Sequence, residues 1–315
     1  MKLQNSVFTG LNDIPAFAGA GTNHYYINAA HLMSMLNRKA FHQVDSRGHV
    51  KNYGLQIQVF NMVNATSFIH TASQGYPMEN AVKAWSDARK ERYADAGFKL
   101  SDLGYGARLR FGLDKTMTDL NQSTSTSMIR PSHLSSTVAD KGEWDFSDVI
   151  ITPPVLDQST SLEGNDLFDS FVLHLTGDHT EETGAGDETV KFTHVGMIQS
   201  WTQNTRGWAT PDSTETVQPE NPLAFARASS PSSGALTNEV SDEQKQSPPY
   251  SNVDDDTAES VFAELVLQGQ IESAFPNPTT NDDIVVAPGG VAKLTITNND
   301  SSAAYPLVSI RIFEL

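Results

Sequence analysis

The chain has 315 residues, a formal net charge of −17 and no cysteine. The lack of cysteine excludes disulfide frameworks, cysteine-ligated zinc and thiol nucleophiles. No apolar run approaches the roughly 20 residues that a membrane-spanning helix needs, and the first residues lack the apolar core of a signal peptide. We therefore expect a soluble protein that is not exported by the usual route, long enough for two ordinary domains.

The charge is unevenly distributed along the chain. Residues 1–140 hold 14 Lys and Arg against 10 Asp and Glu, whereas residues 141–315 hold 7 against 28. The acidic second part should repel polyanions. Neither end carries the Arg- and Lys-rich arm with which a protein neutralises packaged nucleic acid. We expect no sequence-specific binding of nucleic acid, and solubility is the simplest explanation for the acidity.

Residues 1–140 predict a first β domain with one helix. Alternation of apolar and polar side chains predicts a strand over 53–62, paired with a strand over 41–50. β-Branched and aromatic residues predict further strands over 66–71 and 105–113.

The helix is predicted near residues 78–96. Pro77 suits a first-turn position, Val82 and Trp85 fall on one buried stripe, and Gly97 suits the left-handed residue that ends a helix. The helix also carries four basic residues: Lys83, Arg89, Lys90 and Arg92. Such a face is usually solvated, and contact with an anionic partner is the alternative.

A second β domain is predicted over 141–315. Residues 121–141 are rich in Ser and Thr and predict a linker. Three extended segments follow over 142–152, 169–178 and 190–201, each bounded by Gly, Pro or Asp.

The sequence near 202–258 predicts a long surface excursion, because it is rich in Pro and Ser and has no hydrophobic period. Strands return over 260–272, 283–287, 291–297 and 307–313. Residues 288–290, Pro-Gly-Gly, predict a hairpin turn between two of them. The last strand is expected to pair inside a sheet, so trimming it should be costly.

No motif identifies a reaction, and we predict no catalytic residue and no organic cofactor. His174 and His194 fall on neighbouring predicted strands and could hold a metal together with a carboxylate. Alternation also allows His174 to face solvent. The run Asp254, Asp255 and Asp256 could bind a structural calcium ion through its oxygens, although a solvated acidic loop is the commoner explanation.

Two β domains in tandem, one inserted helix, a long loop and no catalytic motif resemble a double jelly-roll viral major capsid protein. The stretch 80–97, followed by Gly142-Glu143-Trp144, is similar to coat proteins of circular single-stranded DNA viruses from environmental samples. Among named groups it resembles those of the lipid-containing finnlakeviruses, which are bacteriophages.

This resemblance implies an all-β subunit with two jelly-roll β-sandwiches, over 1–140 and 141–315. Three subunits would form a pseudo-hexagonal capsomer of an icosahedral shell over an internal membrane. The protein would be made in the host cytoplasm and reside in the virion. Its partners would be other copies of itself, minor capsid or vertex proteins, and the internal membrane. The basic residues Lys83, Arg89, Lys90 and Arg92 would then lie at an interface or face the particle interior.

Two other functions remain open from the sequence. A carbohydrate-binding β-sandwich module would use exposed aromatic residues, and Trp208, in a predicted loop, is the best candidate. Trp85 is better explained as helix core, and Trp144 and Trp201, at strand ends, are more often core or interface residues. A β-sandwich hydrolase would need a carboxylate pair or a metal cluster, and residue spacing alone supplies neither. Fold alone does not decide among these functions.

Overall fold

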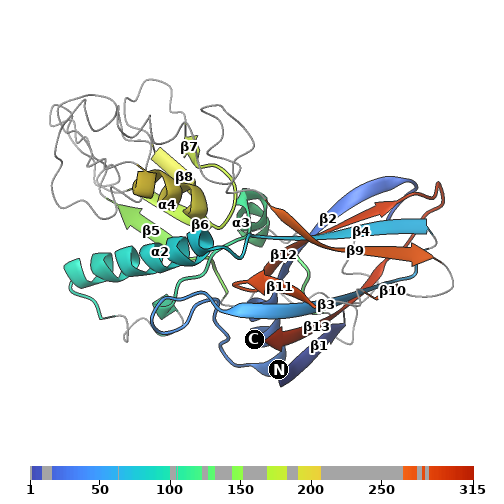
Figure 1. The fold of residues 1–315 in the computed structure, drawn as a ribbon, viewed down its shortest axis with the longest axis horizontal. Helices are drawn as coiled ribbons and strands as arrows, with labels where there is room; N and C mark the ends of the chain where they lie inside the picture. Colours follow the sequence, from blue (N-terminus) through green and yellow to red (C-terminus); the bar gives the residue numbers. More distant parts are fainter. Residues whose placement is uncertain are drawn as a thin grey trace. The chain divides into compact units, whose positions relative to one another are not determined.

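The computed structural model describes residues 2–8, 16–62, 64–99, 104, 106–122, 127–131, 144–151, 169–182, 191–206, 265–274, 279–280 and 284–315. Within these ranges the protein is mostly antiparallel β-sheet with few helices, as predicted. The chain divides into two compact units (Figure 1). Unit 1 comprises Met1–Ser73, Thr116–Asp145 and Leu265–Leu315, and unit 2 comprises Gln74–Lys115 and Phe146–Glu264.

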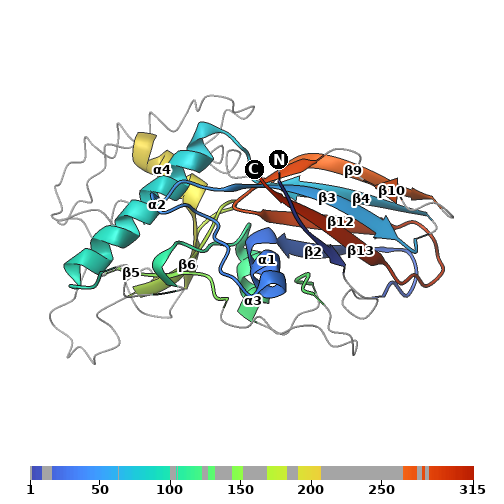
Figure 2. The same cartoon turned by 90° about the horizontal axis from the view of Figure 1, so that it is seen from below.

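Unit 1 contains two antiparallel sheets. Its strands are β1 (Lys2–Phe8), β2 (Gly21–Asn28), β3 (Asn52–Phe60), β4 (Asn64–Thr71), β9 (Val266–Ala274), β10 (Thr279–Thr280), β11 (Val285–Pro288), β12 (Val291–Asn298) and β13 (Leu307–Glu314). The first sheet has the order β1-β13-β3-β10, with β11 also paired to β3, and the second has the order β2-β12-β4-β9. Figures 1 and 2 show the two sheets as the layers of a sandwich.

The sandwich core follows from two-residue alternation in the strands. On β13, Val308, Ile310 and Ile312 are fully buried, whereas Arg311 between them is exposed. The other core strands show the same pattern, and one hydrophobic cluster takes side chains from both sheets. The prediction that the last strand pairs inside a sheet is confirmed, because β13 lies between β1 and β3.

The two units do not follow the predicted division at residue 140. Strands from the two ends of the chain pair with each other: β13 with β1, and β12 with β2. Unit 1 therefore contains both ends of the sequence, and unit 2 is formed by segments from between them. Composition changes along the chain suggested the boundary at 140, but long-range strand pairing determines the units.

The turn at residues 288–290 is not the predicted hairpin. β11 pairs with β3 in the first sheet, whereas β12 pairs with β2 and β4 in the second, so the turn joins the two sheets. Gly290 has a φ of 74°. Its N–H donates to the carbonyl of Ala287, and its carbonyl accepts from the N–H of Ala29, where helix α1 (Ala29–Asn37) begins.

The predicted strand over 41–50 is also wrong. This segment has only an isolated bridge between Val44 and Val50. The carboxylate of Asp45 accepts from the N–H groups of Arg47 and His49 and forms a local turn, which is an alternative to a strand ladder for the backbone. β3, its expected partner, pairs with β13, β10 and β11 instead.

Unit 2 combines one sheet with helices. Its elements are α2 (Tyr76–Asp95), β5 (Asp148–Ile151), β6 (Asp169–His174), β7 (Thr180–Glu182), β8 (Lys191–Gly196) and α4 (Met197–Arg206), and α3 (Lys115–Gln122) starts at the boundary with unit 1. The sheet order is β5-β6-β8-β7, and β6 runs parallel to β8. In the part of unit 2 that the structure describes, this four-stranded sheet is the only one, and a second jelly roll is not seen there.

The helix prediction is confirmed by α2. Pro77 lies in its first turn, Val82 and Trp85 are fully buried, and Gly97 after its end has a φ of 78°.

Two strand predictions in unit 2 are wrong. Of the segment 190–201, the described residues divide into β8 and the start of α4, and the described residues 106–113 have only an isolated bridge from Gly112 to His174. Apolar runs of this length are compatible with a strand or with a buried helix or loop, and packing decides between them.

Most of the predicted linker over 121–141 and of the excursion over 202–258 lies outside the described residues. The ends of α3 and α4 and residues 127–131 are the exceptions. Among the helices that the structure describes, none has the length and apolar character needed to cross a membrane.

Candidate functional site

The sheet of unit 2 brings the two predicted metal candidates together. Val172 on β6 pairs with His194 on β8, and His174 pairs with Gly196. Residues two apart in a strand point to the same face, so His174 and His194 share a face, with ring centroids 6.4 Å apart.

Alternation allowed His174 to face solvent, but in the structure it does not. Its side chain is 0% exposed. Gly177 and Gly196 lie beside the ring: a Cβ at Gly196 would be 3.4 Å from Cε1 of His174 and would clash with the carbonyl oxygen of Gly177. Two residues without side chains thus allow the backbone to cover the histidine, which period-two patterning does not reveal.

The His174 ring is held as one neutral tautomer. Its Nδ1 lies 2.7 Å from the carbonyl oxygen of Thr176, and a carbonyl can only accept, so Nδ1 carries the proton. Nε2 has no hydrogen-bond partner among the described residues. Burial lowers the pKa of His174 to about 3, the bond to Thr176 opposes this shift, and His179, His194 and Lys115 add to it by charge repulsion.

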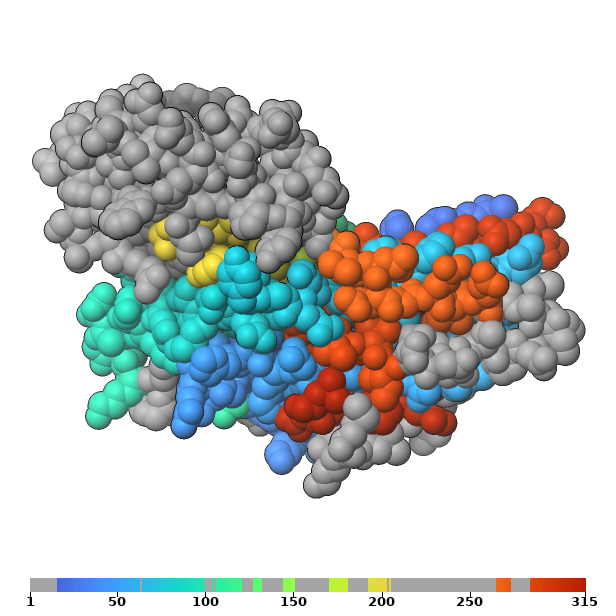
Figure 3. Space-filling view, in the orientation of Figure 1, coloured from blue at the N-terminus to red at the C-terminus, as the bar shows by residue number. Residues whose placement is uncertain are grey.

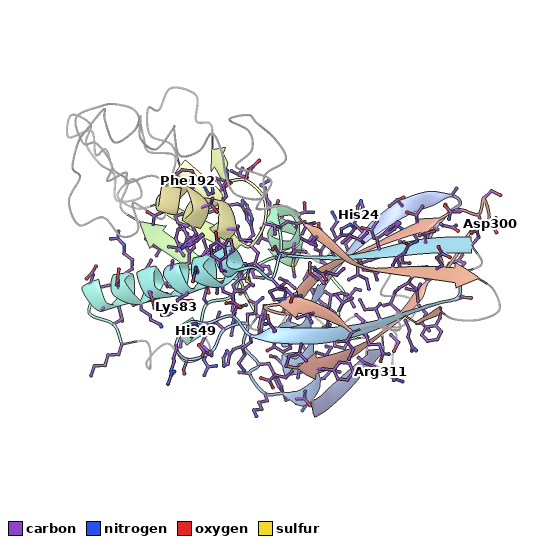
Figure 4. The ribbon with its side chains drawn as sticks, viewed as in Figure 1. His24, His49, Lys83, Phe192, Asp300 and Arg311 are labelled. Carbon is purple, nitrogen blue, oxygen red and sulfur yellow. The ribbon has the colours of Figure 1, made fainter. Side chains whose placement is uncertain are left out.

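His179 completes a group that we call the histidine cluster: His174, His179 and His194. The N–H of Gly196 donates to Nδ1 of His179 at 3.2 Å, and the N–H of His179 donates to Oε1 of Gln199 at 3.2 Å. The His179 ring also packs edge-on against Phe192, labelled in Figure 4, at 5.9 Å between centroids. The cluster therefore links the turn after β6 to β8 and to α4.

The metal hypothesis gains no support from this geometry. Among the described residues, no group of three His, Cys, Asp or Glu side chains is placed to hold a metal ion. The calcium candidates Asp254, Asp255 and Asp256 lie outside the described residues.

Arg89, one of the four interface candidates on α2, is an internal residue of unit 2. It is 6% exposed. Its guanidinium donates to the carbonyls of Gly106 and Ala107 at 2.7 and 3.3 Å, and it lies 4.8 Å above the ring of Tyr93. These contacts tie the segment after α2 to the helix and leave little of the Arg89 side chain at the surface, while its place at an interface stays a prediction.

The other basic residues of α2 are partly neutralised or partly buried. Lys83, labelled in Figure 4, and Lys90 both form ion pairs with Asp87, at 2.6 and 3.4 Å. Burial raises the pKa of Asp87, but the bonds and charges of the two lysines outweigh it, so the net shift is downward. Arg92 is partly buried and makes interactions of its own. The helix therefore presents less free positive charge than its sequence suggests.

Replacing Arg89 with alanine is expected to destabilise unit 2 by about 3 kcal/mol, because two carbonyls lose a charged donor inside the fold. Lys90→Ala, one residue along the same helix, is the matched control and should change stability by no more than about 0.5 kcal/mol. Urea unfolding followed by tryptophan fluorescence measures both, since Trp85 lies on α2. Equal effects of the two substitutions would contradict the internal role of Arg89.

The tryptophan residues differ in exposure. Trp85 packs edge-on against Phe171 at 5.7 Å, and Trp144 stacks on His31 at 5.1 Å; both indoles are buried. Trp201 is partly exposed and packs edge-on against Tyr76, which is 57% exposed, at 6.0 Å. Trp208 lies outside the described residues. The surface aromatic pair in unit 2 is thus Tyr76 with Trp201, which residue spacing did not indicate.

Unit 1 has a cross-strand group that the sequence analysis missed. Lys293 on β12 pairs in register with His70 on β4 and with Tyr26 on β2. His24, labelled in Figure 4, lies two residues before Tyr26 on β2, and therefore on the same face of the sheet. Burial, followed by the charges of Lys293 and His24, lowers the pKa of His70. Only the pairing of β2, β12 and β4 brings these residues together.

Comparison with known proteins adds nothing to this geometry: no family model, curated protein or solved structure matches the chain.

Proposed function

We propose that the chain is the coat subunit of a virus and that unit 1 is a jelly roll forming the wall of the shell. The role is structural, not enzymatic. The observation that carries the proposal is the nested pairing of strands in unit 1. The first strand pairs with the last (β1 with β13), and β2 pairs with β12. Further in, β3 pairs with β10 and β11, and β4 pairs with β9.

Nested pairing of this kind is what results when one long antiparallel ribbon is rolled into two sheets. Eight-stranded jelly rolls of this type build viral capsids, and they also occur in lectins and cupins. The described part of unit 1 has the β1-β13-β3-β10 and β2-β12-β4-β9 sheets that such rolling requires. The fold supports a coat protein but does not by itself exclude the other uses.

Unit 2 would be an insertion in this jelly roll. Both of its segments lie in the sequence between β4 and β9, the innermost pair of the nest. Connections between strands tolerate long insertions and commonly carry functions specific to one protein. In the proposed coat, unit 1 would form the wall of the shell and unit 2 would carry functions that are specific to this virus.

The described residues contain one sandwich, which changes the oligomer that the resemblance implies. A pseudo-hexagonal capsomer of three subunits needs two sandwiches in each, and a second would have to come from outside the described residues. We therefore propose ring-shaped capsomers of identical chains, closed by symmetry, and the number of chains is the quantity to measure.

The edge of the second sheet is the contact that we favour for assembly. β9 is its last described strand, and Val266 and Leu267 are 39% and 50% exposed. Figure 3 shows β9, in orange, at the surface. Of residues 265–274 only Glu272 is charged, although the chain carries a net charge of −17. Edge strands that avoid pairing usually carry charges or proline, so this edge is suited to a second copy of the chain.

The purified protein is expected to form closed oligomers, shells or sheets. Light scattering gives the mass, and negative-stain images of the same fractions show the shape. Leu267→Lys should shift the protein towards monomers, whereas Leu36→Lys, at an exposed leucine of α1, should not. A protein that stays monomeric across salt and calcium concentrations would overturn the proposal.

The exposed pair of Tyr76 and Trp201 favours a second candidate, a carbohydrate-binding role for unit 2. Two rings at 80° to each other form a corner where an apolar sugar face could pack against one of them. A glycan array tests this role, with Tyr76→Ala as the variant and Tyr305→Ala, at an equally exposed tyrosine of unit 1, as the control. Binding that survives Tyr76→Ala would exclude this site.

A further inference from the structure

We propose that unit 2 contains an acid-sensitive junction, in which the neutral rings of His174 and His179 hold β8 and the start of α4 against β6. Protonation of these rings releases β8 and α4 from β6. The proposal goes beyond the coat role and does not depend on it.

The junction lies where several backbone segments of unit 2 meet at the end of β6. Leu173 and Leu175 exchange backbone hydrogen bonds with Gly112, and Leu175 also accepts from the N–H of Ile198 in α4. Gly196, the last residue of β8, donates to His179. The position of each of these segments therefore depends on the residues that surround His174.

Both histidines occupy positions that require the neutral ring. Nδ1 of His179 accepts a hydrogen bond from Gly196, so a proton on that nitrogen would remove the bond. Nδ1 of His174 already donates to Thr176, so a second proton must go to Nε2. That nitrogen is buried with no partner in the described part of the chain, and burying an unpaired charge is costly.

The charged and titratable groups acting on His174 make protonation still less favourable. They are His179 from the turn after β6, His194 from β8 and Lys115 from the start of α3. Each of these three groups is a cation or becomes one in acid. The ring cannot reach water without backbone movement, because the backbone at Gly177 and Gly196 closes over it.

The direction of the pH effect follows from the two states of His174. A histidine in an unfolded chain has a pKa of about 6.5, whereas burial lowers the pKa of folded His174 to about 3. The contribution of the neutral ring to stability is complete above pH 6.5 and is lost as the pH falls from 6.5 towards 3. The equilibrium constant for opening should rise by up to about tenfold per pH unit, on the order of a hundredfold between pH 7 and pH 4.

Hydrogen exchange of the full chain, read by mass spectrometry between pH 7.5 and pH 4, tests the junction. After correction for the intrinsic pH dependence of exchange, amides of β6, β8 and α4 should open progressively more in acid. In His174→Asn the equilibrium constant for opening should rise less as the pH falls, by up to about tenfold for each pH unit. The reason is that the asparagine amide can still donate to Thr176 but cannot take up a proton. His49→Asn, at an exposed histidine of unit 1, should leave the exchange of unit 2 unchanged.

A second measurement keeps the proposal testable if His174→Asn does not fold. Nitrogen chemical shifts of the histidine rings in the wild-type protein report the tautomer and the charge of each ring. His174 should remain neutral with the proton on Nδ1 at pH 5.5, whereas an ordinary histidine with a pKa of about 6.5 is mostly charged at that pH. A His174 ring that titrates near pH 6.5 in the folded protein, or an unchanged pH dependence of exchange in His174→Asn, would overturn the proposal.

Discussion

A chain that ends at Pro306, without β13, is expected not to fold unit 1. β13 is the central strand of the first sheet, with β1 on one side and β3 on the other. Its side chains Val308, Ile310 and Ile312 are each 0% exposed. Burying a side chain of this size contributes about 1.5–3 kcal/mol, so the three together contribute about 5–9 kcal/mol, comparable with the whole stability of a domain.

The truncation has a further cost in backbone pairing. Without β13, β1 loses its only strand partner among the described residues and β3 loses a ladder from Leu307 to Glu314. Circular dichroism and thermal unfolding measure the result. A chain that ends at Glu314 is the control, because it loses only the half-exposed Leu315 and one backbone hydrogen bond to Asn52. A cooperative unfolding transition for unit 1 in the chain ending at Pro306 would contradict the central role of β13.

Gly290→Ala is expected to destabilise unit 1 by about 3 kcal/mol. The residue has a φ of 74°, which costs an L-residue about 1 kcal/mol or more. A Cβ there would lie 2.9 Å from both Cβ of Ala29 and Cδ2 of Tyr53. These neighbours belong to α1 and β3 and are fully buried, so they have little room to move, and such overpacking adds about 1–3 kcal/mol.

Gly97→Ala is the matched control for this substitution. Gly97 has a similar φ of 78°, but nothing lies within 4 Å of its added Cβ. Gly97→Ala should therefore lower the free energy of unfolding by only about 1 kcal/mol, which is the contribution of the backbone conformation alone. Chemical denaturation of the two variants separates steric contact from backbone strain. Equal losses would show that the close approach of α1 and β3 to the turn does not contribute.

Several structural elements were predictable because their signal is local. Alternating apolar residues predicted β3 and β13, β-branched and aromatic residues predicted β4, and a 3.6-residue stripe with Pro77 and Gly97 at its ends predicted α2. Periodicity reflects which side of an element meets the core, and this property is written into successive residues. The same logic failed over 190–201, where β8 ends at Gly196 and α4 begins without a break.

The candidate site was predictable only in part. His174 and His194 were expected on neighbouring strands, and they are. The burial of His174 was not, because it depends on two glycines at 177 and 196 that let the backbone close over its ring. The burial of Arg89 was not predictable for a similar reason: its carbonyl partners lie 17 and 18 residues further along the chain, beyond any helical period.

By itself, the sequence of this protein determined its β character, the position of its long helix and several of its strands, such as β3, β4 and β13. Only the tertiary structure decided which strands pair, and therefore that the two ends of the chain form one sandwich while residues between them form another unit. The physical reason is that alternation specifies a face for each strand but not its partner. Partners are selected by contacts such as those of β1 with β13, which join residues some 300 positions apart and exist only once the whole core has formed.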